Sequence, residues 1–297
     1  MRSGYFWDYE YRMRAPSGSQ YVVLSRGIPV YGAGGKEKTW VGIHLDITDR
    51  ELSAQHRIEQ ARNIARFNAE LEQFAYVSAH DLQEPLRMIS SYVQLLSRRY
   101  KGKLDTDADT YIGYAVEGAE RLQTLLQDLL ELQQVGKGNK PVVIAPLSSA
   151  VMKACENLSL DFAKYHAEVT CDTLPTFEYE EQSYVQLFVH LFENALKYRR
   201  EGVHPQIRVS AERVLKMNAW EVAVKDNGIG IPEEFTEKIF DVFQRLHPRS
   251  MYPGTGIGLA ICKKIVEVNG GHIRVESDVG EGSTFYFTIP LSRERAA

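Results

Sequence analysis

The stretch F-A-Y-V-S-A-H-D-L-Q-E-P-L-R at Phe74–Arg87 places a histidine, His80, directly before a carboxylate, Asp81. An ordinary histidine has a pKa of about 6.5, so near neutral pH its ring is largely uncharged and nucleophilic. Asp81 can hold the proton of one ring nitrogen and leave the other nitrogen bare. At about 100° per residue, His80 lies roughly opposite an apolar stripe, which predicts a ring facing solvent. The stripe consists of Leu82, Leu86, Ile89, Val93 and Leu96.

A second group of polar residues lies in E-N-A-L-K-Y, at Glu193–Tyr198. Asn194 and Lys197 are three apart, so on a helix they share a face. An amide oxygen is a suitable Mg²⁺ ligand, and a lysine offers a point charge to phosphate. Alone the motif is weak, because exposed Asn and Lys on a helix are usually only solvated.

Two glycine-containing segments have the composition of ligand loops. Asp226–Gly230 (D-N-G-I-G) ends a predicted strand, so its carboxylate can accept from an exocyclic amine while the glycines let the backbone approach a flat ring. Gly254–Leu259 (G-T-G-I-G-L) precedes an apolar helix, whose first N–H groups can cradle phosphate. Neither is specific alone: the first is often only a turn, and the second lacks the preceding strand of a dinucleotide fingerprint.

Two further segments have a simple structural explanation beside a functional one. Arg245 lies in F-D-V-F-Q-R-L, before the glycine-rich segment, and reads as a loose cation on a lid that reaches a terminal phosphate. Gly280–Phe285 (G-E-G-S-T-F) reads as a hairpin turn.

Composition sets the class of protein. The 297 residues predict two or three domains, and the net charge of −4 gives no sign of nucleic-acid or membrane affinity. Three widely spaced cysteines fit free thiols better than a disulfide framework or a zinc site. No apolar run approaches about 18 residues, and no signal peptide is recognisable. We expect a cytoplasmic protein, or the cytoplasmic part of one.

Residues 1–49 predict three strands, at Tyr5–Met13, Gln20–Pro29 and Thr39–Asp46. Glu10–Arg14 (E-Y-R-M-R) and Asp46–Arg50 (D-I-T-D-R) resemble the end of a PAS sensor domain. The resemblance implies that 1–49 is the C-terminal part of such a domain, either cut from a longer protein or completed by dimerisation. No cysteine lies in this segment, so it offers no candidate for a flavin–thiol photosensor.

The period then becomes helical, and residues 50–135 predict a linker and a helical hairpin. The first helix, Leu52–Tyr100, would be about 70 Å long and needs a partner; Pro85 should bend it. Apolar seams suggest a parallel coiled coil leading into a homodimeric four-helix bundle that includes a second helix, Thr106–Gln134. The seams are Ile58, Ala61 and Ala65, then Ile64, Phe67, Leu71, Phe74 and Ser78.

A Gly/Lys hinge at 136–141 precedes an α/β sandwich domain at 142–297, so the predicted fold class is multidomain α+β. The expected helices are Leu147–Ala163, Glu181–Arg199 and Gly258–Asn269. The expected strands are Glu168–Cys171, Thr176–Tyr179, Gln206–Arg213, Trp220–Asp226, His272–Ser277 and Ser283–Pro290.

The order of these motifs carries more information than any one of them. From Ala54 to Leu291 the chain closely resembles a sensor histidine kinase, in which a phosphoacceptor bundle precedes a Bergerat-type ATP-binding domain shared with some gyrases and chaperones. The motifs H-D-L-Q-E-P-L-R and F-Q-R-L-H are most similar to the corresponding sequences in kinases of the phytochrome-associated group. No chromophore-binding domain is present in the sequence, so the resemblance does not imply light sensing.

The resemblance implies a role for each matching residue. His80 would be the phosphorylated nucleophile, Asp81 would orient it or act as its general base, and Arg245 would be the cation that reaches the γ-phosphate. Asn194 would hold Mg²⁺. The implied ATP-binding residues are Lys197 and Tyr198 beside the nucleotide, Asp226 on the adenine amine with Gly228 and Gly230 near the ring, Gly254, Thr255, Gly256, Gly258 and Leu259 along the phosphates, and Thr284 near the adenine.

The implied activity is Mg-ATP-dependent autophosphorylation of a homodimer, followed by transfer to an aspartate of a separate response regulator. Two positions depart from the family pattern. His190 stands where many related kinases have asparagine and where the related ATPases have a catalytic glutamate. Glu84 stands where kinases with strong phosphatase activity tend to carry Thr or Asn. Two other functions stay open: an ATPase or conformational clamp that turns over ATP without a phosphoprotein, and a non-catalytic signalling scaffold.

Overall fold

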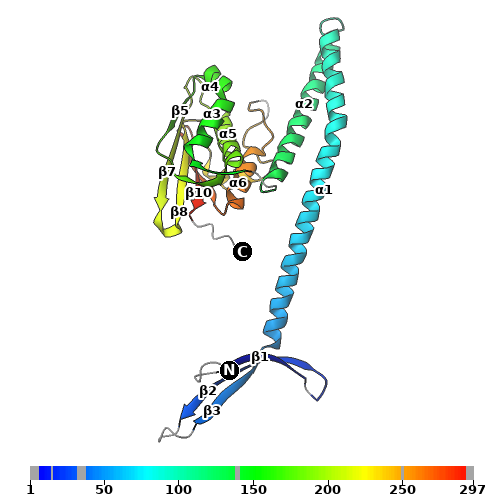
Figure 1. The fold of residues 1–297 in the computed structure, drawn as a ribbon. Coiled ribbons are helices and arrows are strands. Elements are labelled where there is room, and N and C mark those ends of the chain that lie inside the picture. The colour runs from blue at the N-terminus through cyan, green and yellow to red at the C-terminus, as the bar shows by residue number, and fades with distance from the viewer. Residues whose placement is uncertain (1–6, 15, 32–37, 138–140, 249–250, 292–297) are drawn as a thin grey trace. The chain divides into compact units, whose positions relative to one another are not determined.

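The computed structural model describes residues 7–14, 16–31, 38–137, 141–248 and 251–291 (Figure 1). In the long helix α1 (Thr48–Tyr100), the side chains of 54, 55, 58, 61, 65 and 67–80 lie outside this description. The chain divides into two compact units, Met1–Phe74 and Ala75–Ala297, which are described separately.

The first unit begins with an antiparallel sheet in the order β1-β2-β3, which confirms the three predicted strands. The helix start is tied to this sheet, because the backbone N–H of Val22 donates to Thr48 Oγ1 at 2.8 Å. Three strands do not define a PAS domain, so that resemblance stays a prediction. The strands are β1 (Trp7–Arg14), β2 (Gln20–Tyr31) and β3 (Lys38–Asp46).

Helix α1 runs without interruption from Thr48 to Tyr100 and continues through Pro85. Most of the residues predicted for the coiled-coil seam lie outside the described side chains, as does the ring of His80. A coiled coil also needs a second chain, so it stays a prediction, as does a hinge at 136–141, of which 138–140 are not described.

Helix α2 (Thr106–Gln134) has the predicted bounds and runs antiparallel to the second half of α1 (Figure 1). The carboxylate of Asp105 caps it by accepting from Ala108 N at 2.8 Å. Gln94 Nε2 donates to Glu120 Oε1 at 3.1 Å and links the two helices. The hairpin leaves much of its apolar surface exposed, including Leu82, Ile89, Tyr92, Leu96 and Leu122.

The second unit also contains a two-layer domain, in which a five-stranded sheet has the order β5-β7-β8-β10-β9. Only β5 and β7 are parallel. Inward residues such as Val209, Val224 and Phe287 pack with apolar side chains of the helices. The strands are β5 (Glu168–Cys171), β7 (Gln206–Val214), β8 (Ala219–Asp226), β9 (Ile273–Asp278) and β10 (Gly282–Pro290); the helices are α3 (Ser148–Asn157), α4 (Ser159–Tyr165), α5 (Glu181–Lys197) and α6 (Gly258–Val268).

Two local features differ from the predictions. The helix predicted over Leu147–Ala163 is split into α3 and α4, because Leu158 leaves helical geometry at φ −104° and ψ 14°. A small sheet of β4 (Val142–Pro146) and β6 (Thr176–Glu180) contains a strand that was not predicted. Short 3-10 helices span Leu215–Met217, Glu233–Phe235 and Lys238–Phe240. Within the described ranges, no helix has the length and hydropathy needed to cross a bilayer.

Candidate nucleotide site

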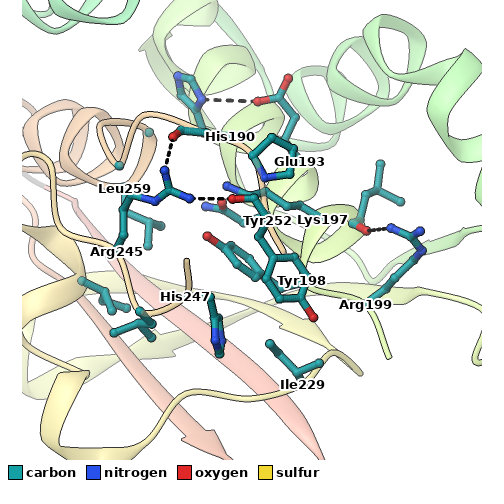
Figure 2. A pocket seen from close by; sticks show the side chains of 18 of the residues that line it. His190, Glu193, Lys197, Tyr198, Arg199, Ile229, Arg245, His247, Tyr252 and Leu259 are labelled. Atoms are coloured by element: carbon teal, nitrogen blue, oxygen red, sulfur yellow. Dashed lines mark hydrogen bonds and ion pairs between the residues drawn. The ribbon is translucent and has the colours of Figure 1, made fainter. Parts of the chain in front are cut away.

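A cavity of about 1060 Å³ lies where the end of α5, the end of β8 and the segment before α6 meet (Figure 2). Its volume suits a ligand of nucleotide size. The cavity brings together most of the residues predicted to bind nucleotide. These are Asn194, Lys197, Tyr198, Asp226, Gly230, Arg245, Gly254, Thr255, Gly256, Gly258 and Leu259.

The last turn of α5 supplies the cationic part of the wall. Asn194 and Lys197 both line the cavity, as their spacing predicted. Burial lowers the pKa of Lys197, and the nearby charge of Arg245 lowers it further. The Lys197 ammonium lies 4.7 Å from the centroid of the Tyr198 ring. Two cations at one cavity, of which Lys197 is desolvated, are a suitable setting for a polyanion.

Asp226 is the last residue of β8 and lies at the floor of the cavity. Its Oδ1 accepts from the backbone N–H groups of Gly228 at 2.8 Å and Ser283 at 3.3 Å. Burial raises the pKa of Asp226, although these hydrogen bonds oppose the rise. Among the described residues both bonds fall on Oδ1, which leaves Oδ2 to accept from a ligand amine.

The two glycines after Asp226 differ in whether they line the cavity. Gly228 does not line the cavity, and a side chain there would meet the Tyr198 carbonyl oxygen at 2.7 Å. Gly230 does line it, at φ +76°, and a Cβ there would lie 2.1 Å from the Asp278 carbonyl oxygen. Both positions need glycine because of neighbouring backbone, whatever the cavity holds.

Arg245 is not the loose cation that was predicted. Its guanidinium donates to the carbonyl oxygens of Gly254 at 2.8 Å and Tyr252 at 2.6 Å (Figure 2). These two hydrogen bonds hold the glycine-rich loop in place. Because both acceptors are neutral carbonyl groups, the positive charge of Arg245 stays available beside the loop.

Three rings meet on one side of the cavity. The centroid of Tyr252 lies 5.0 Å from that of Tyr198 and 5.2 Å from that of His247. Sequence reasoning missed His247 and Tyr252, because nothing local marks either as a lining residue. The cluster offers an apolar surface on which a flat base can stack.

The loop before α6 depends on glycine at Gly256. Its φ is +80°, and a Cβ there would lie 2.7 Å from the Gln244 carbonyl oxygen. The Gly256 carbonyl in turn accepts from Phe243 N at 3.0 Å. The loop therefore packs directly against the segment that carries Arg245.

Gly256→Ala should weaken ATP binding at least about tenfold, because the new Cβ would clash with the Gln244 carbonyl and displace the loop. The left-handed backbone would cost roughly 1 kcal/mol in addition. Gly102→Ala is the matched control, since Gly102 has φ +71° with no heavy atom within 4 Å of a built Cβ. It should lose a similar increment of stability and bind ATP normally. Titration calorimetry measures the affinities; equal affinity of both variants would remove the loop from the site.

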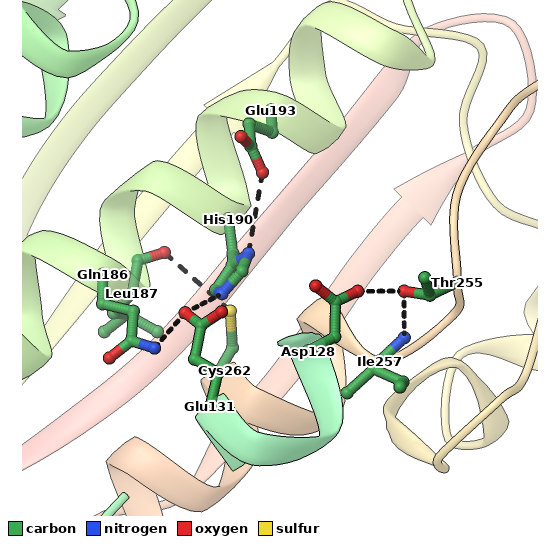
Figure 3. Close-up of polar contacts among 9 residues, drawn as sticks. All are labelled: Asp128, Glu131, Gln186, Leu187, His190, Glu193, Thr255, Ile257 and Cys262. Atoms are coloured by element: carbon green, nitrogen blue, oxygen red, sulfur yellow. Dashed lines mark hydrogen bonds and ion pairs between the residues drawn. The ribbon is translucent and has the colours of Figure 1, made fainter. Parts of the chain in front are cut away.

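Helix α2 also reaches the cavity, through Thr124 and Asp128. The hydroxyl of Thr255 donates a short hydrogen bond to Asp128 Oδ2 (Figure 3). Burial raises the pKa of Asp128, and the hydrogen bond from Thr255 opposes the rise. A carboxylate from the helical hairpin thus lies on the loop predicted to carry phosphate.

His190 lies between two carboxylates (Figure 3). Its Nε2 is 3.1 Å from Glu131 Oε1 on α2, and its Nδ1 is 3.6 Å from Glu193 Oε2. Burial alone would lower the pKa of His190, but hydrogen bonds to both carboxylates and their charges outweigh it and raise the pKa to about 9. The ring is therefore a largely buried imidazolium at neutral pH.

This pKa predicts a pH-dependent stability. The folded protein keeps a proton that the unfolded chain releases near pH 6.5, so the stabilisation is complete below 6.5 and is lost as the pH rises through about 9. The free energy of unfolding should fall by up to about 3 kcal/mol over that window. Denaturant titrations at several pH values measure this fall.

His190→Gln should flatten the pH profile. His272→Gln, which changes an exposed histidine, should keep the wild-type slope. An unchanged slope in His190→Gln would contradict the ion-pair assignment.

Besides Gly228, three predicted site residues lie outside the cavity lining or outside the described side chains. Thr284 does not line it, whereas its neighbours Ser283 and Phe285 do. Successive side chains of a strand point to opposite faces, which accounts for this alternation. A place for Thr284 near the adenine stays a prediction. Asp81 is exposed on α1 and does not line the cavity, and the ring of His80 lies outside the described side chains.

Family models match both halves of the second unit. Residues 70–138 match the His Kinase A (phospho-acceptor) domain, and residues 179–293 match the histidine kinase-, DNA gyrase B- and HSP90-like ATPase. The first match contains His80, and the second contains most of the cavity wall. The chain contains the core of a sensor histidine kinase.

This kinase core is similar to proteins of known name. Cyanobacterial phytochrome A of Nostoc sp. is 47% identical over 82% of this chain and 31% of its own length. The phytochrome-like protein Cph1 of Synechocystis sp. is 43% identical over 80% of this chain and 31% of its own length. The chain thus spans about a third of these relatives.

Solved structures share the fold of the kinase core. Full-length ShkA in complex with AMPPNP aligns with a TM-score of 0.56 at 22% identity, covering 73% of this chain and 45% of that chain. The histidine kinase ThkA, in complex with the response regulator protein TrrA, aligns with a TM-score of 0.51 at 20% identity, covering 97% of this chain and 80% of that chain. The two-layer domain and the helical region therefore recur together in other proteins.

Proposed function

We propose that this chain is an ATP-dependent histidine autokinase, whose α5–β8–α6 cavity binds ATP and whose phosphoacceptor is His80. The observation that carries the proposal is the convergence of three separate motifs on one cavity: N-A-L-K-Y, D-N-G-I-G and G-T-G-I-G-L. The match of residues 70–138 to a phosphoacceptor domain supports His80 as the acceptor.

The cavity wall contains a ring cluster and, next to it, two cations: the Lys197 ammonium lies 4.7 Å from the Tyr198 ring, and Arg245 donates to the Tyr252 carbonyl. We assign the adenine to the side with Asp226 Oδ2 and the ring cluster of Tyr198, His247 and Tyr252. The triphosphate then lies toward Lys197, Arg245 and the N–H groups that open α6. This orientation pairs each part of ATP with the chemistry that binds it.

Asn194 is the residue we propose for Mg²⁺. It is half-buried and lines the cavity one turn before Lys197. Among the described residues, no group of three or more His, Cys, Asp or Glu side chains could hold a metal ion. A site with Asn194 as its protein ligand fits Mg²⁺, which commonly takes few protein ligands beside phosphates and waters. When bound, the ion would neutralise charge on the phosphates.

In the proposed reaction, a neutral nitrogen of His80 attacks the γ-phosphorus. A nitrogen–phosphorus bond forms, the bond to the β–γ bridging oxygen breaks, and ADP leaves with the electron pair. Asp81 takes the proton from the other ring nitrogen. Lys197 and Arg245 stabilise the negative charge that moves onto the leaving group.

We also propose a homodimer formed through the hairpin of α1 and α2. The exposed Leu82, Ile89 and Leu96 would lose solvent contact in a four-helix bundle, which the single hairpin cannot achieve. The product phosphohistidine would pass its phosphoryl group to an aspartate of a response regulator. We propose domain boundaries at 1–49, 50–135, 136–141 and 142–297. We propose that the first segment derives from a PAS domain and that α1 forms a coiled coil in the dimer. We also propose a cytoplasmic location.

One experiment separates the kinase from its alternatives. The protein is incubated with γ-labelled ATP and Mg²⁺, and label on the protein and free phosphate are measured together. We expect protein-bound label that depends on Mg²⁺, is lost in acid and survives alkali. Continuous phosphate release without labelled protein would indicate an ATPase or clamp, and absence of both would indicate a scaffold.

A further inference from the structure

The last turns of α2 close one side of the cavity. Thr124 and Asp128 line it, and Leu125, Leu132 and Val135 pack against the core of the two-layer domain. Val135 is only 4% exposed. The hairpin is therefore docked on the ATP-binding domain by an apolar contact, with polar groups beside it.

Asp128 makes the contact that matters for a nucleotide. Its carboxylate accepts the hydroxyl proton of Thr255, whose oxygen lies 3.4 Å from the donating backbone nitrogen of Ile257 at the start of α6 (Figure 3). The first N–H groups of a helix carry partial positive charge and attract anions. Asp128 thus places a carboxylate at the loop where the triphosphate would lie.

Glu131, three residues further along the same face of α2, forms a second anchor. Its Oε1 lies 3.1 Å from His190 Nε2 and also accepts a short hydrogen bond from the amide of Gln186. Both partners lie on α5, one to two turns before Asn194. The two carboxylates therefore hold α2 across both phosphate-side elements, the glycine-rich loop and α5.

We infer that Asp128 and Glu131 form a carboxylate latch, which holds α2 on the ATP-binding domain and which the triphosphate of ATP displaces. The inference rests on the proposed function. A triphosphate and Asp128 would bring like charges to one half-buried loop, and such repulsion is strong where water is scarce. By reciprocity, docked α2 weakens ATP binding, and bound ATP weakens the docking of α2. Nucleotide binding thereby releases the domain from the hairpin.

Asp128→Asn tests the latch directly. It keeps the shape of the side chain and removes the charge, so Mg-ATP should bind at least about fivefold more tightly. Glu117→Gln is the matched control, because it removes one negative charge from an exposed position of the same helix and should leave affinity unchanged. Weaker binding by Asp128→Asn would instead make Asp128 a ligand of the nucleotide or its metal, and would overturn the latch. Unchanged binding would also overturn it.

A locked variant provides an independent test that does not depend on charge. Asp128→Cys combined with Thr255→Cys should form a disulfide that keeps α2 docked at the cavity wall, where it obstructs the path of the triphosphate. The oxidised protein should therefore lose ATP binding at least about tenfold relative to the same protein after reduction. Each single cysteine variant, treated alike, controls for the native cysteines. Equal ATP affinity of the oxidised and reduced double variant would overturn the inference.

The wild-type protein separates this inference from the proposed function. If wild type binds Mg-ATP and both tests fail, only the latch is wrong. If wild type and all variants, including the reduced double variant, bind no ATP, the proposed function is wrong and the latch falls with it.

Discussion

Replacing His80 with glutamine should abolish protein labelling by γ-labelled ATP, by at least about 10³-fold. Glutamine is similar in size and polar, but its amide nitrogen has no lone pair available for attack on phosphorus. ATP affinity should stay within about twofold of wild type, because the proposed ATP contacts come from other residues, which line the cavity. The expected change therefore separates chemistry from binding. Filter-retained label and titration calorimetry on the same preparation measure the two quantities.

The chain offers a matched control on the same helix. His56 is an exposed histidine of α1 whose Nε2 lies 3.1 Å from the Gln60 amide. His56→Gln makes the identical substitution and should keep full labelling. Label retained on His80→Gln would move the phosphoacceptor to another residue.

Asp226→Asn should lower ATP affinity about 100-fold, the cost of replacing a charged acceptor with a group that leaves a buried donor unpaired. The amide would keep the bonds that Oδ1 accepts from Gly228 and Ser283, but its nitrogen would occupy the Oδ2 position and face the adenine amine with a donor. The domain should remain folded, because the substitution is isosteric and removes a buried charge. Calorimetry with Mg-ATP measures the affinity, and size-exclusion chromatography follows the proposed dimer.

Asp172→Asn is the control for this experiment. Asp172 is exposed and pairs with Arg208 at 3.0 Å, and neither residue lines the cavity. Removing the Asp172 charge and its ion pair should leave ATP affinity unchanged. GTP gives a second comparison, since its ring carries a carbonyl where adenine carries the amine, so wild type should prefer ATP and Asp226→Asn should lose that preference. Unchanged ATP affinity in Asp226→Asn would remove the adenine assignment.

Local chemistry explains which parts of the fold were predictable from sequence. The bounds of α2 agree because Asp105 caps the helix and an apolar step of three and four residues runs to Gln134. The motifs at Asn194, Asp226 and Gly254 were found because each is a short run on one element. The strand β4 was missed although Val142, Val143 and Ile144 favour a strand, because the run is only five residues long and its partner β6 is distant in the sequence.

Contacts between distant segments could not be predicted in this way. Thr255 and Asp128 are 127 residues apart, and nothing distinguishes Asp128 from the other acidic residues of its amphipathic helix. The tether of Arg245 to Gly254 and Tyr252 uses carbonyl oxygens, which every residue possesses. Ser283 and Phe285 also line the cavity, and a turn sequence does not indicate which face of the following strand is buried.

Mapping the phosphorylated residue by mass spectrometry tests the kinase assignment most directly. The protein is incubated with Mg-ATP, kept at neutral or alkaline pH, digested and sequenced by fragmentation that retains the nitrogen–phosphorus bond. We expect one phosphorylated peptide, with the phosphoryl group on His80. A phosphoryl group on any other residue, or an unmodified His80 after ATP has been consumed, would contradict an autokinase acting at this histidine.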